Sequence, residues 1–227
     1  MQLNKNDALH NLAIKRKQTT PPVGSFPLGF YADVYECDFV SPYTKGACNV
    51  DADIFLLLQD WSSDDEMKRS SIDPDVLHYG RTLSLPTNRN LEQLLYDYFD
   101  GLKISDTYGT NLYPFIKSGG MSAYIPQQDL VMAAEQFALP QIRIVGPKLV
   151  ICFGKATFNA VRMVLGERLV DSVDEGIKSP FSIDHTHFWL QSHPGRLGKI
   201  NRNKGGVDRV SEDWDHMSEQ FKKYSVV

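Results

Sequence analysis

The sequence lacks any hydrophobic run near the ~20 residues that a membrane-spanning helix requires, so we expect no membrane partner. Its N-terminus is polar and has no signal-peptide core, which predicts a cytoplasmic protein. Cysteines are scarce: Cys37, Cys48 and Cys152 are odd in number and widely spaced. This spacing argues against a disulfide framework and against a cysteine-bound iron–sulfur cluster. Cys152 lies in the apolar run 149–153, where we expect it to be buried.

The chain also lacks the strong positive charge of a protein that coats nucleic acid, since its formal net charge is −4. A local basic face remains compatible with this balance. Five cations gather in the stretch 196–209 against a single acid, Asp208: Arg196, Lys199, Arg202, Lys204 and Arg209. Such a cluster is typical either of a phosphate-binding surface or of a solvated loop.

Length and composition predict one soluble globular domain, because 227 residues with 42% hydrophobic content suffice for one sizeable core. Residues 1–24 are polar and indicate a short helix or tail followed by a linker. We assign the domain to residues 25–227. Internal repeats and low-complexity tracts are absent from the sequence.

Strand and helix patterns alternate along the chain. Apolar runs predict strands over 53–58, 106–115, 148–153 and 188–190, and helical spacing predicts helices over 90–99, 127–144, 155–165 and 212–224. A polar loop of about 25 residues is expected between Trp61 and Arg89. This alternation favours a three-layer α/β/α domain with a central, mainly parallel, four-stranded sheet.

Polar segments follow the predicted strands, at the positions where parallel sheets bind ligands. They are Gln59-Asp60-Trp61, Asn111 to Pro114, where the second strand enters a loop, Gly154-Lys155-Ala156, and His193-Pro194-Gly195. The His-Pro pair opens a glycine- and arginine-rich loop. Three of the four segments carry polar side chains that we expect to meet in one pocket.

Four motifs occur in order: LLLQDW at 56–61, TNLYPF at 110–115, GPKLVICFGKA at 146–156 and SHPGRLG at 192–198. Together with the helix QDLVMAAEQFALPQIRIV, this set resembles the uracil-DNA glycosylase superfamily over roughly residues 50–200. The first motif, LQDWS, departs from the Gly-Gln-Asp-Pro-Tyr of the best-known branch. The resemblance implies a monofunctional DNA glycosylase that flips out a pyrimidine and hydrolyses its N-glycosidic bond. Some branches of the superfamily carry an iron–sulfur cluster, but no cysteine pair here has the spacing for one, so we expect no cofactor and no metal.

The chemistry of that reaction suits the residues at the strand ends. Positive charge develops on the sugar and negative charge on the departing base, so a carboxylate and a hydrogen-bond donor are needed. Asp60 fits the first role and His193 the second. Asn111 carries both a donor and an acceptor and is expected to read one base edge.

The remaining base pocket follows from the resemblance. Ser62 stands where the best-known branch has a tyrosine that blocks the 5-position of the base, so uracil or a 5-modified pyrimidine, such as those of phage DNA, is the expected substrate. Gln59 and Trp61 flank Asp60 and are expected to contact the base. Leu83 lies near the position of the stacking phenylalanine. Because leucine stacks poorly, Trp61, Tyr79 or Tyr113 is expected to substitute, and Trp61 is also a candidate to close the space at Ser62.

The last motif predicts the DNA contacts. Leu197 is an apolar residue between cations, four residues after His193, which is the spacing of the superfamily's wedge leucine. Phosphate contacts are expected from a set of nearby cations and from the lysine of the GKA turn: Arg196, Lys199, Arg202 and Lys155.

Other interpretations remain open at this point. Asp60, Asn111 and His193 each have a purely structural alternative, as a cap or turn residue. The same fold could serve as a catalytically weak module that binds DNA or a protein. An unrelated metal-dependent hydrolase would use His185, His187 and His193, the first two of which share a strand face. We expect a monomer, and the sequence leaves open the excised base, the strand preference and a role in repair or antiviral defence.

Overall fold

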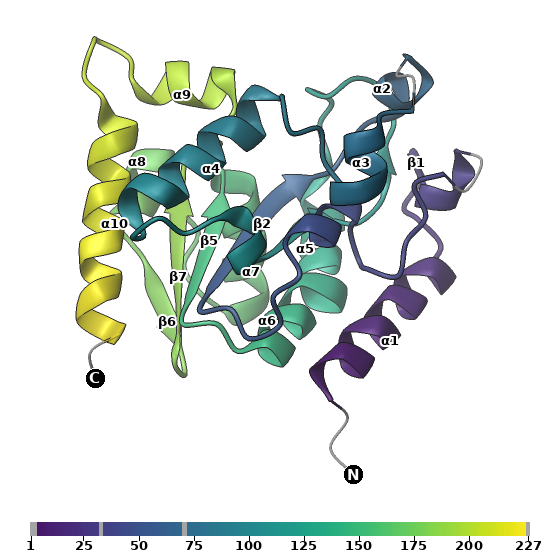
Figure 1. Cartoon of the computed structure of the whole chain (residues 1–227), viewed down its shortest axis with the longest axis horizontal. Coiled ribbons are helices and arrows are strands. Elements are labelled where there is room, and N and C mark those ends of the chain that lie inside the picture. The colour runs from purple at the N-terminus through teal and green to yellow at the C-terminus, as the bar shows by residue number, and fades with distance from the viewer. Residues whose placement is uncertain (1–3, 32–33, 70–71, 226–227) are drawn as a thin grey trace.

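The structure is a computed structural model that describes residues 4–31, 34–69 and 72–225. Residues 1–3 of the predicted segment 1–24 and residues 226–227 of the predicted domain 25–227 lie outside the described residues. A central five-stranded sheet is flanked by helices on both faces, which confirms the three-layer α/β/α class (Figure 1). Within the described part of the chain, no helix is both long and apolar enough to cross a membrane.

The sheet has the strand order β3-β2-β5-β7-β6. Its strands are β2 (Ile54–Asp60), β3 (Tyr108–Tyr113), β5 (Leu149–Phe153), β6 (Phe181–Ile183) and β7 (Thr186–Gln191). The first four strands in this order run parallel, and β6 pairs antiparallel with β7. The predicted count of four strands was therefore one too low. β6 escaped prediction because its three residues are too few to display a period of two.

Alternation along β2 explains the two layers of helices. Phe55 and Leu57 face the hydrophobic core that contains α5 (Gln127–Ala133), α6 (Leu139–Val145) and α7 (Lys155–Leu165). Leu56 and Leu58 face the core that contains α4 (Pro86–Tyr98) and α10 (Arg209–Ser225). Both faces of the strand are buried, as the continuous apolar run predicts. Cys152 is buried in the first of these cores, as expected.

The helices predicted from periodicity over 90–99, 127–144, 155–165 and 212–224 are all present, and the chain forms further short helices that were not predicted. Their bounds are α1 (Lys5–Gln18), α2 (Asp64–Arg69), α3 (Pro74–Tyr79), α4 (Pro86–Tyr98), α5 (Gln127–Ala133), α6 (Leu139–Val145), α7 (Lys155–Leu165), α8 (Val173–Ile177), α9 (Arg196–Arg202) and α10 (Arg209–Ser225). A π-helical segment, Ala134–Ala138, joins α5 to α6, so the helix predicted over 127–144 is continuous. A small second sheet pairs β1 (Ser25–Phe26) with β4 (Ile116–Lys117).

The segment after β2 is not the long polar loop that we expected, because it contains α2, α3 and the start of α4. Asp73 caps α3 by accepting a hydrogen bond from the Asp75 amide, and Gly80 ends it with a φ of 68°. A side chain at Gly80 would place Cβ 1.6 Å from the Pro42 carbonyl oxygen. Helices of six residues show too few turns to display periodicity, which is why the pattern was missed.

The N-terminal segment forms α1, which packs along the domain beside α6 (Figure 1). Leu9 and Ala13 are buried there, and Leu9 belongs to the core of the domain. Arg16 is 1% exposed and donates to the carbonyl oxygens of Cys37 and Phe39. The helix within residues 1–24 therefore shares the core of the domain.

Candidate active site

Three strands deliver polar side chains to one cavity. Asp60 ends β2, Asn111 lies in β3 opposite Leu58, and His193 follows the end of β7. Because these strands are parallel, their carboxyl ends meet at the same edge of the sheet. All three side chains line a cavity of about 920 Å³, whose outer wall comes from the segment that contains α2 and α3.

The Asp60 carboxylate is held by two neighbours. Its Oδ2 lies 2.8 Å from Nζ of Lys117, and both side chains of this ion pair are less than a tenth exposed. Its Oδ1 accepts a hydrogen bond from Nε2 of Gln59 at 3.1 Å. Lys117 also donates to the Met121 carbonyl oxygen at 2.5 Å. The carboxylate is therefore fixed in position, and its charge is balanced by a buried ammonium.

Sequence reasoning missed Lys117, because it is far from Asp60 along the chain. It lies in β4, a strand of two residues that only its pairing with β1 defines. A lone lysine in a short apolar stretch carries no local signal of burial or of a partner.

Asn111 is 1% exposed and lies inside β3 rather than in a loop, which corrects the predicted boundary. Its Oδ1 accepts a hydrogen bond from the Ser41 hydroxyl at 2.6 Å. This bond orients the amide and leaves Nδ2 as the donor that can face a ligand, while Oδ1 retains a second lone pair. Ser41 is a second partner that the sequence did not indicate.

His193 is held in one tautomer by its own turn. The backbone amide of Gly195 donates to Nδ1 at 3.0 Å, so the neutral imidazole carries its proton on Nε2. A Cβ on residue 195 would lie 2.9 Å from Nδ1, which explains the need for glycine in this turn. Desolvation lowers the pKa of His193 below its ordinary value, although the nearby Asp60 carboxylate acts in the opposite direction. A neutral Nε2–H donor at neutral pH follows.

We expect the imidazole of His193 to titrate below about 6.5, the ordinary histidine value. Because protonation is then less favourable in the folded chain than in the unfolded chain, this group stabilises the fold fully above pH 6.5. Its contribution declines as the pH falls from 6.5 toward the lowered value. Ring ¹H–¹⁵N NMR spectra recorded from pH 5 to 8, with His193→Gln to assign the signal, measure both the pKa and the tautomer. A pKa at or above 6.5 would contradict the prediction.

The other predicted base-binding residues divide into two groups. Trp61 and Ser62 line the cavity, and the Trp61 indole donates to the Gly80 carbonyl oxygen at 2.8 Å. Tyr113, by contrast, is fully buried in the core, where its hydroxyl lies 2.6 Å from Oγ of Ser25. Leu83 is 39% exposed and does not line the cavity. Gln59 does not line the cavity either, and its amide instead donates to Asp60. None of Tyr113, Leu83 and Gln59 is therefore placed to contact a base in this cavity.

Of the three aromatic residues proposed to replace the stacking phenylalanine, Trp61 alone lines the cavity, since Tyr79 is surface-exposed beside His78. The structure adds two aromatic rings that the sequence did not indicate, Tyr35 and Tyr43. Tyr35 packs edge-on against Trp61, with the ring centroids 5.4 Å apart. Both tyrosines come from the segment before β2, where no strand or helix pattern pointed to a site.

The predicted DNA-binding residues are also separated by the structure. Arg196 lines the cavity, and Leu197 projects from the first turn of α9 with 70% of its surface exposed. Lys199 lines an adjoining pocket of about 110 Å³ that His193 also borders. Lys155 is directed elsewhere, because its Nζ donates to the Asp171 carbonyl oxygen at 3.0 Å. The predicted glycine- and arginine-rich loop is the helix α9 from Arg196 onward.

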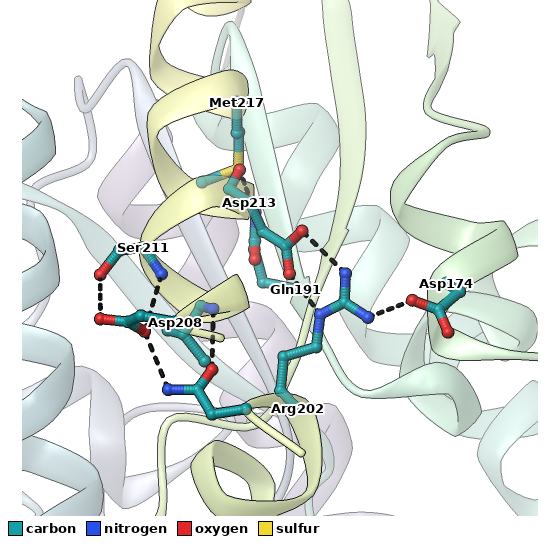
Figure 2. A network of polar contacts seen from close by, with 9 residues as sticks. Asp174, Gln191, Arg202, Asp208, Ser211, Asp213 and Met217 are labelled. Atoms are coloured by element: carbon teal, nitrogen blue, oxygen red, sulfur yellow. Dashed lines mark hydrogen bonds and ion pairs between the residues drawn. The ribbon is translucent and has the colours of Figure 1, made fainter. Parts of the chain in front are cut away.

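Arg202 has a structural role that argues against the predicted phosphate contact. Its Nε and Nη2 donate to the two carboxylate oxygens of Asp213 at 2.5 and 2.8 Å, and Nη1 pairs with Asp174 (Figure 2). The Arg202 side chain is 10% exposed. A guanidinium engaged on both sides ties α9 to α10 and α8, and it has little capacity left for a phosphate.

The histidine cluster of the metal-dependent alternative does not form. His187 lies near the start of β7, where its Nδ1 is 2.6 Å from Oγ of Ser182, and His185 precedes the strand. His193 follows the other end of the same strand, so the length of β7 separates the rings, about 3.3 Å per residue. This geometry removes the basis for a three-histidine site.

No protein-family model matches this sequence, and no curated protein matches it either.

Proposed function

We propose that the protein is a monofunctional DNA glycosylase that flips out a pyrimidine and hydrolyses its N-glycosidic bond to leave an abasic site. The observation that carries the proposal is the convergence of Asp60, Asn111 and His193 on one cavity. The three residues come from three of the motifs that resemble the uracil-DNA glycosylase superfamily. Their side chains supply the carboxylate, the base-reading amide and the donor that the reaction needs.

The proposed chemistry separates charge between sugar and base. As the bond from C1′ to the base nitrogen breaks, Nε2–H of His193 donates to a base oxygen that becomes negative. The Asp60 carboxylate stabilises the positive sugar. A water molecule then forms the new bond to C1′, and the proton that it loses passes through solvent to the base anion, which leaves as the neutral base. Asn111 donates from Nδ2 to one base atom and accepts from another through Oδ1.

Access to the cavity requires a base to leave its stack. Leu197, exposed on α9 next to Arg196, is suited to fill the gap that the flipped base leaves. Arg196 and Lys199 are exposed beside it and are suited to contact phosphates.

The test is to incubate the protein with DNAs that carry uracil, 5-methyl, 5-hydroxymethyl or larger 5-substituted pyrimidines, in single and double strands. Alkali cleavage then reports abasic sites. Strand breakage after alkali with at least one of these bases, absent from an Asp60→Asn/His193→Ala control, supports the proposal. Absence of abasic sites with every base overturns it.

One observation favours a second candidate, a catalytically weak DNA-binding module on the same fold. The ion pair with Lys117 balances the charge that Asp60 would offer to the sugar. Such a module would bind DNA that contains a flippable base and yield no abasic product. The same assay, combined with a binding measurement on each DNA, separates the two candidates.

Leu197→Ala should slow excision from duplex DNA about tenfold or more and leave excision from single strands nearly unchanged, because a wedge matters only where a stack must be opened. Single-turnover rates on matched duplex and single-stranded substrates measure this. Met163→Ala is the control, since Met163 is a comparably exposed apolar residue on α7. Equal losses on both substrates would argue against a wedge.

Ser62→Tyr should block excision of 5-substituted pyrimidines and retain excision of uracil. Ser62 lines the cavity, and a phenol at this position would fill the space that a substituent needs. Ser62→Ala keeps that space open and serves as the matched control. If the wild-type protein releases uracil efficiently but never a 5-substituted base, Trp61 closes the space and the open-pocket interpretation is wrong.

A further inference from the structure

The cavity wall contains a buried guanidinium, that of Arg81, which the proposed mechanism does not use. Arg81 follows Gly80 at the end of α3, is 9% exposed and lines the cavity together with Asn111 and Trp61. By contrast, Arg196 lines the same cavity from an exposed position on α9. Arg81 therefore belongs to the interior of the cavity rather than to its rim.

The contacts of Arg81 satisfy little of its hydrogen-bonding capacity. Nη1 donates to the Tyr79 carbonyl oxygen at a long 3.4 Å, and the guanidinium carbon lies 5.3 Å from the centroid of the Tyr43 ring. Nε is buried without a hydrogen-bond partner. Within residues 4–31, 34–69 and 72–225, no carboxylate forms an ion pair with Arg81. A guanidinium has five N–H donors, so most of them remain available.

The nearby carboxylates of the cavity are already engaged. Asp60 is paired with Lys117, and Oδ2 of Asp73 accepts from the Thr82 hydroxyl at 2.5 Å. A buried cation without an anion is costly, because neither water nor a counter-charge replaces its lost solvation. A fork of planar N–H donors in such a position matches the geometry of a carboxylate or phosphate.

A glycine makes room for the Arg81 side chain on its way to the cavity. Nη1 of Arg81 passes over Gly46, where a Cβ would lie 2.3 Å from it. Gly46 belongs to the 3₁₀ turn Pro42–Gly46, which begins directly after Ser41, the residue that orients Asn111. The guanidinium and the base-reading amide are therefore supported by the same turn.

We propose that Arg81 forms an oxyanion-binding subsite inside the cavity, which takes a negatively charged oxygen group of the bound nucleotide. This inference rests on the proposed function for the identity of the ligand as a nucleotide. The oxyanion has two sources, an acidic substituent on the base or the phosphate next to the flipped sugar. Both present two or more oxygens to the guanidinium, and both neutralise its charge.

The experiment measures, by calorimetry, the binding of two nucleosides, deoxyuridine and 5-carboxydeoxyuridine, and of one nucleotide, deoxyuridine 5′-monophosphate. The wild-type protein should bind one of the two anionic ligands at least about tenfold tighter than deoxyuridine, as expected for a charge-assisted bidentate contact. The 5-carboxyl ligand identifies the base as the source, and the monophosphate identifies the backbone.

Arg81→Gln should abolish this preference and keep the affinity for deoxyuridine, while Arg81→Lys should retain part of it because the charge remains but the fork is lost. Arg143→Gln is the control, since Arg143 is exposed on α6 and the change in net charge is the same. Gly46→Ala would bring Cβ to 2.3 Å from Nη1 of Arg81 and to 2.8 Å from the Tyr79 carbonyl oxygen, so it shifts both the guanidinium and the end of α3 and should also reduce the preference. Thermal unfolding of each variant verifies that the fold is retained.

Equal affinities for all three ligands, or a preference that survives in Arg81→Gln, would overturn the subsite and leave Arg81 as a cap of α3. The base-excision assay separates this failure from that of the proposed function. Uracil excision without an anion preference refutes the subsite alone. An anion preference without excision of any base refutes the glycosylase and leaves the subsite standing.

Discussion

Replacing Asp60 with asparagine is expected to lower the single-turnover rate of base excision by about two orders of magnitude or more and to leave DNA binding largely intact. The substitution keeps the shape of the side chain and removes the negative charge that, in the proposed mechanism, stabilises the sugar cation. Rapid-quench measurement with enzyme in excess over DNA isolates this step from product release. Near-normal turnover would remove Asp60 from the mechanism.

The ion pair with Lys117 makes a second variant necessary. Asp60→Asn leaves a buried ammonium without its anion, which is expected to cost about 3–5 kcal/mol of folding free energy. The double variant Asp60→Asn/Lys117→Met removes both charges and should recover most of that stability while the rate stays low. If the double variant also recovers turnover, the loss in the single variant came from the unpaired lysine and not from the missing carboxylate.

His193→Ala is expected to slow excision by about two orders of magnitude, equivalent to roughly 3 kcal/mol of transition-state stabilisation, the range for loss of one oxyanion donor. The Gly195 amide sets the donor atom as Nε2, so His193→Gln, which offers an amide donor, should retain part of the rate. Binding of DNA should change little, because the donor acts on charge that develops during the reaction.

Two further measurements test whether His193 acts as a hydrogen-bond donor. Removal of metal ions with a chelator should leave the wild-type rate unchanged. A rate abolished by chelation and restored by a metal ion would make His193 a ligand instead of a donor. Thermal unfolding of His193→Ala should show only a small loss of stability, since the one hydrogen bond of His193 lies within its own turn.

The sequence by itself determined the fold class and the edge of the sheet at which the candidate site lies. The apolar runs at Ile54–Leu58 and Leu149–Phe153 have no polar face, so both had to be central strands covered by helices on two sides. When such strands run parallel in one sheet, their carboxyl ends lie at the same edge of that sheet. The polar residues after them, Asp60 and His193 among others, lie at that edge for this topological reason.

Local periodicity did not resolve the short elements. β6 has three residues, and α2 and α3 have six each. These sequences are too short to show the strand period of two residues or the helix period of about 3.6, so they cannot be told from a polar loop. These elements hold their conformation through partners elsewhere in the chain. Gly80, which ends α3 against Pro42, is one example.

Only the tertiary structure decided which side chains face the cavity and what else they contact. Tyr113 and Leu83 were candidates by position, yet Tyr113 points into the core and Leu83 into solvent. Arg202 was predicted to contact phosphate, yet carboxylates from two other helices, α8 and α10, engage it. Lys117 and Arg81 carried no sequence signal at all. Pairing and burial of charges depend on residues that are remote along the chain, and a pattern of neighbours does not encode them.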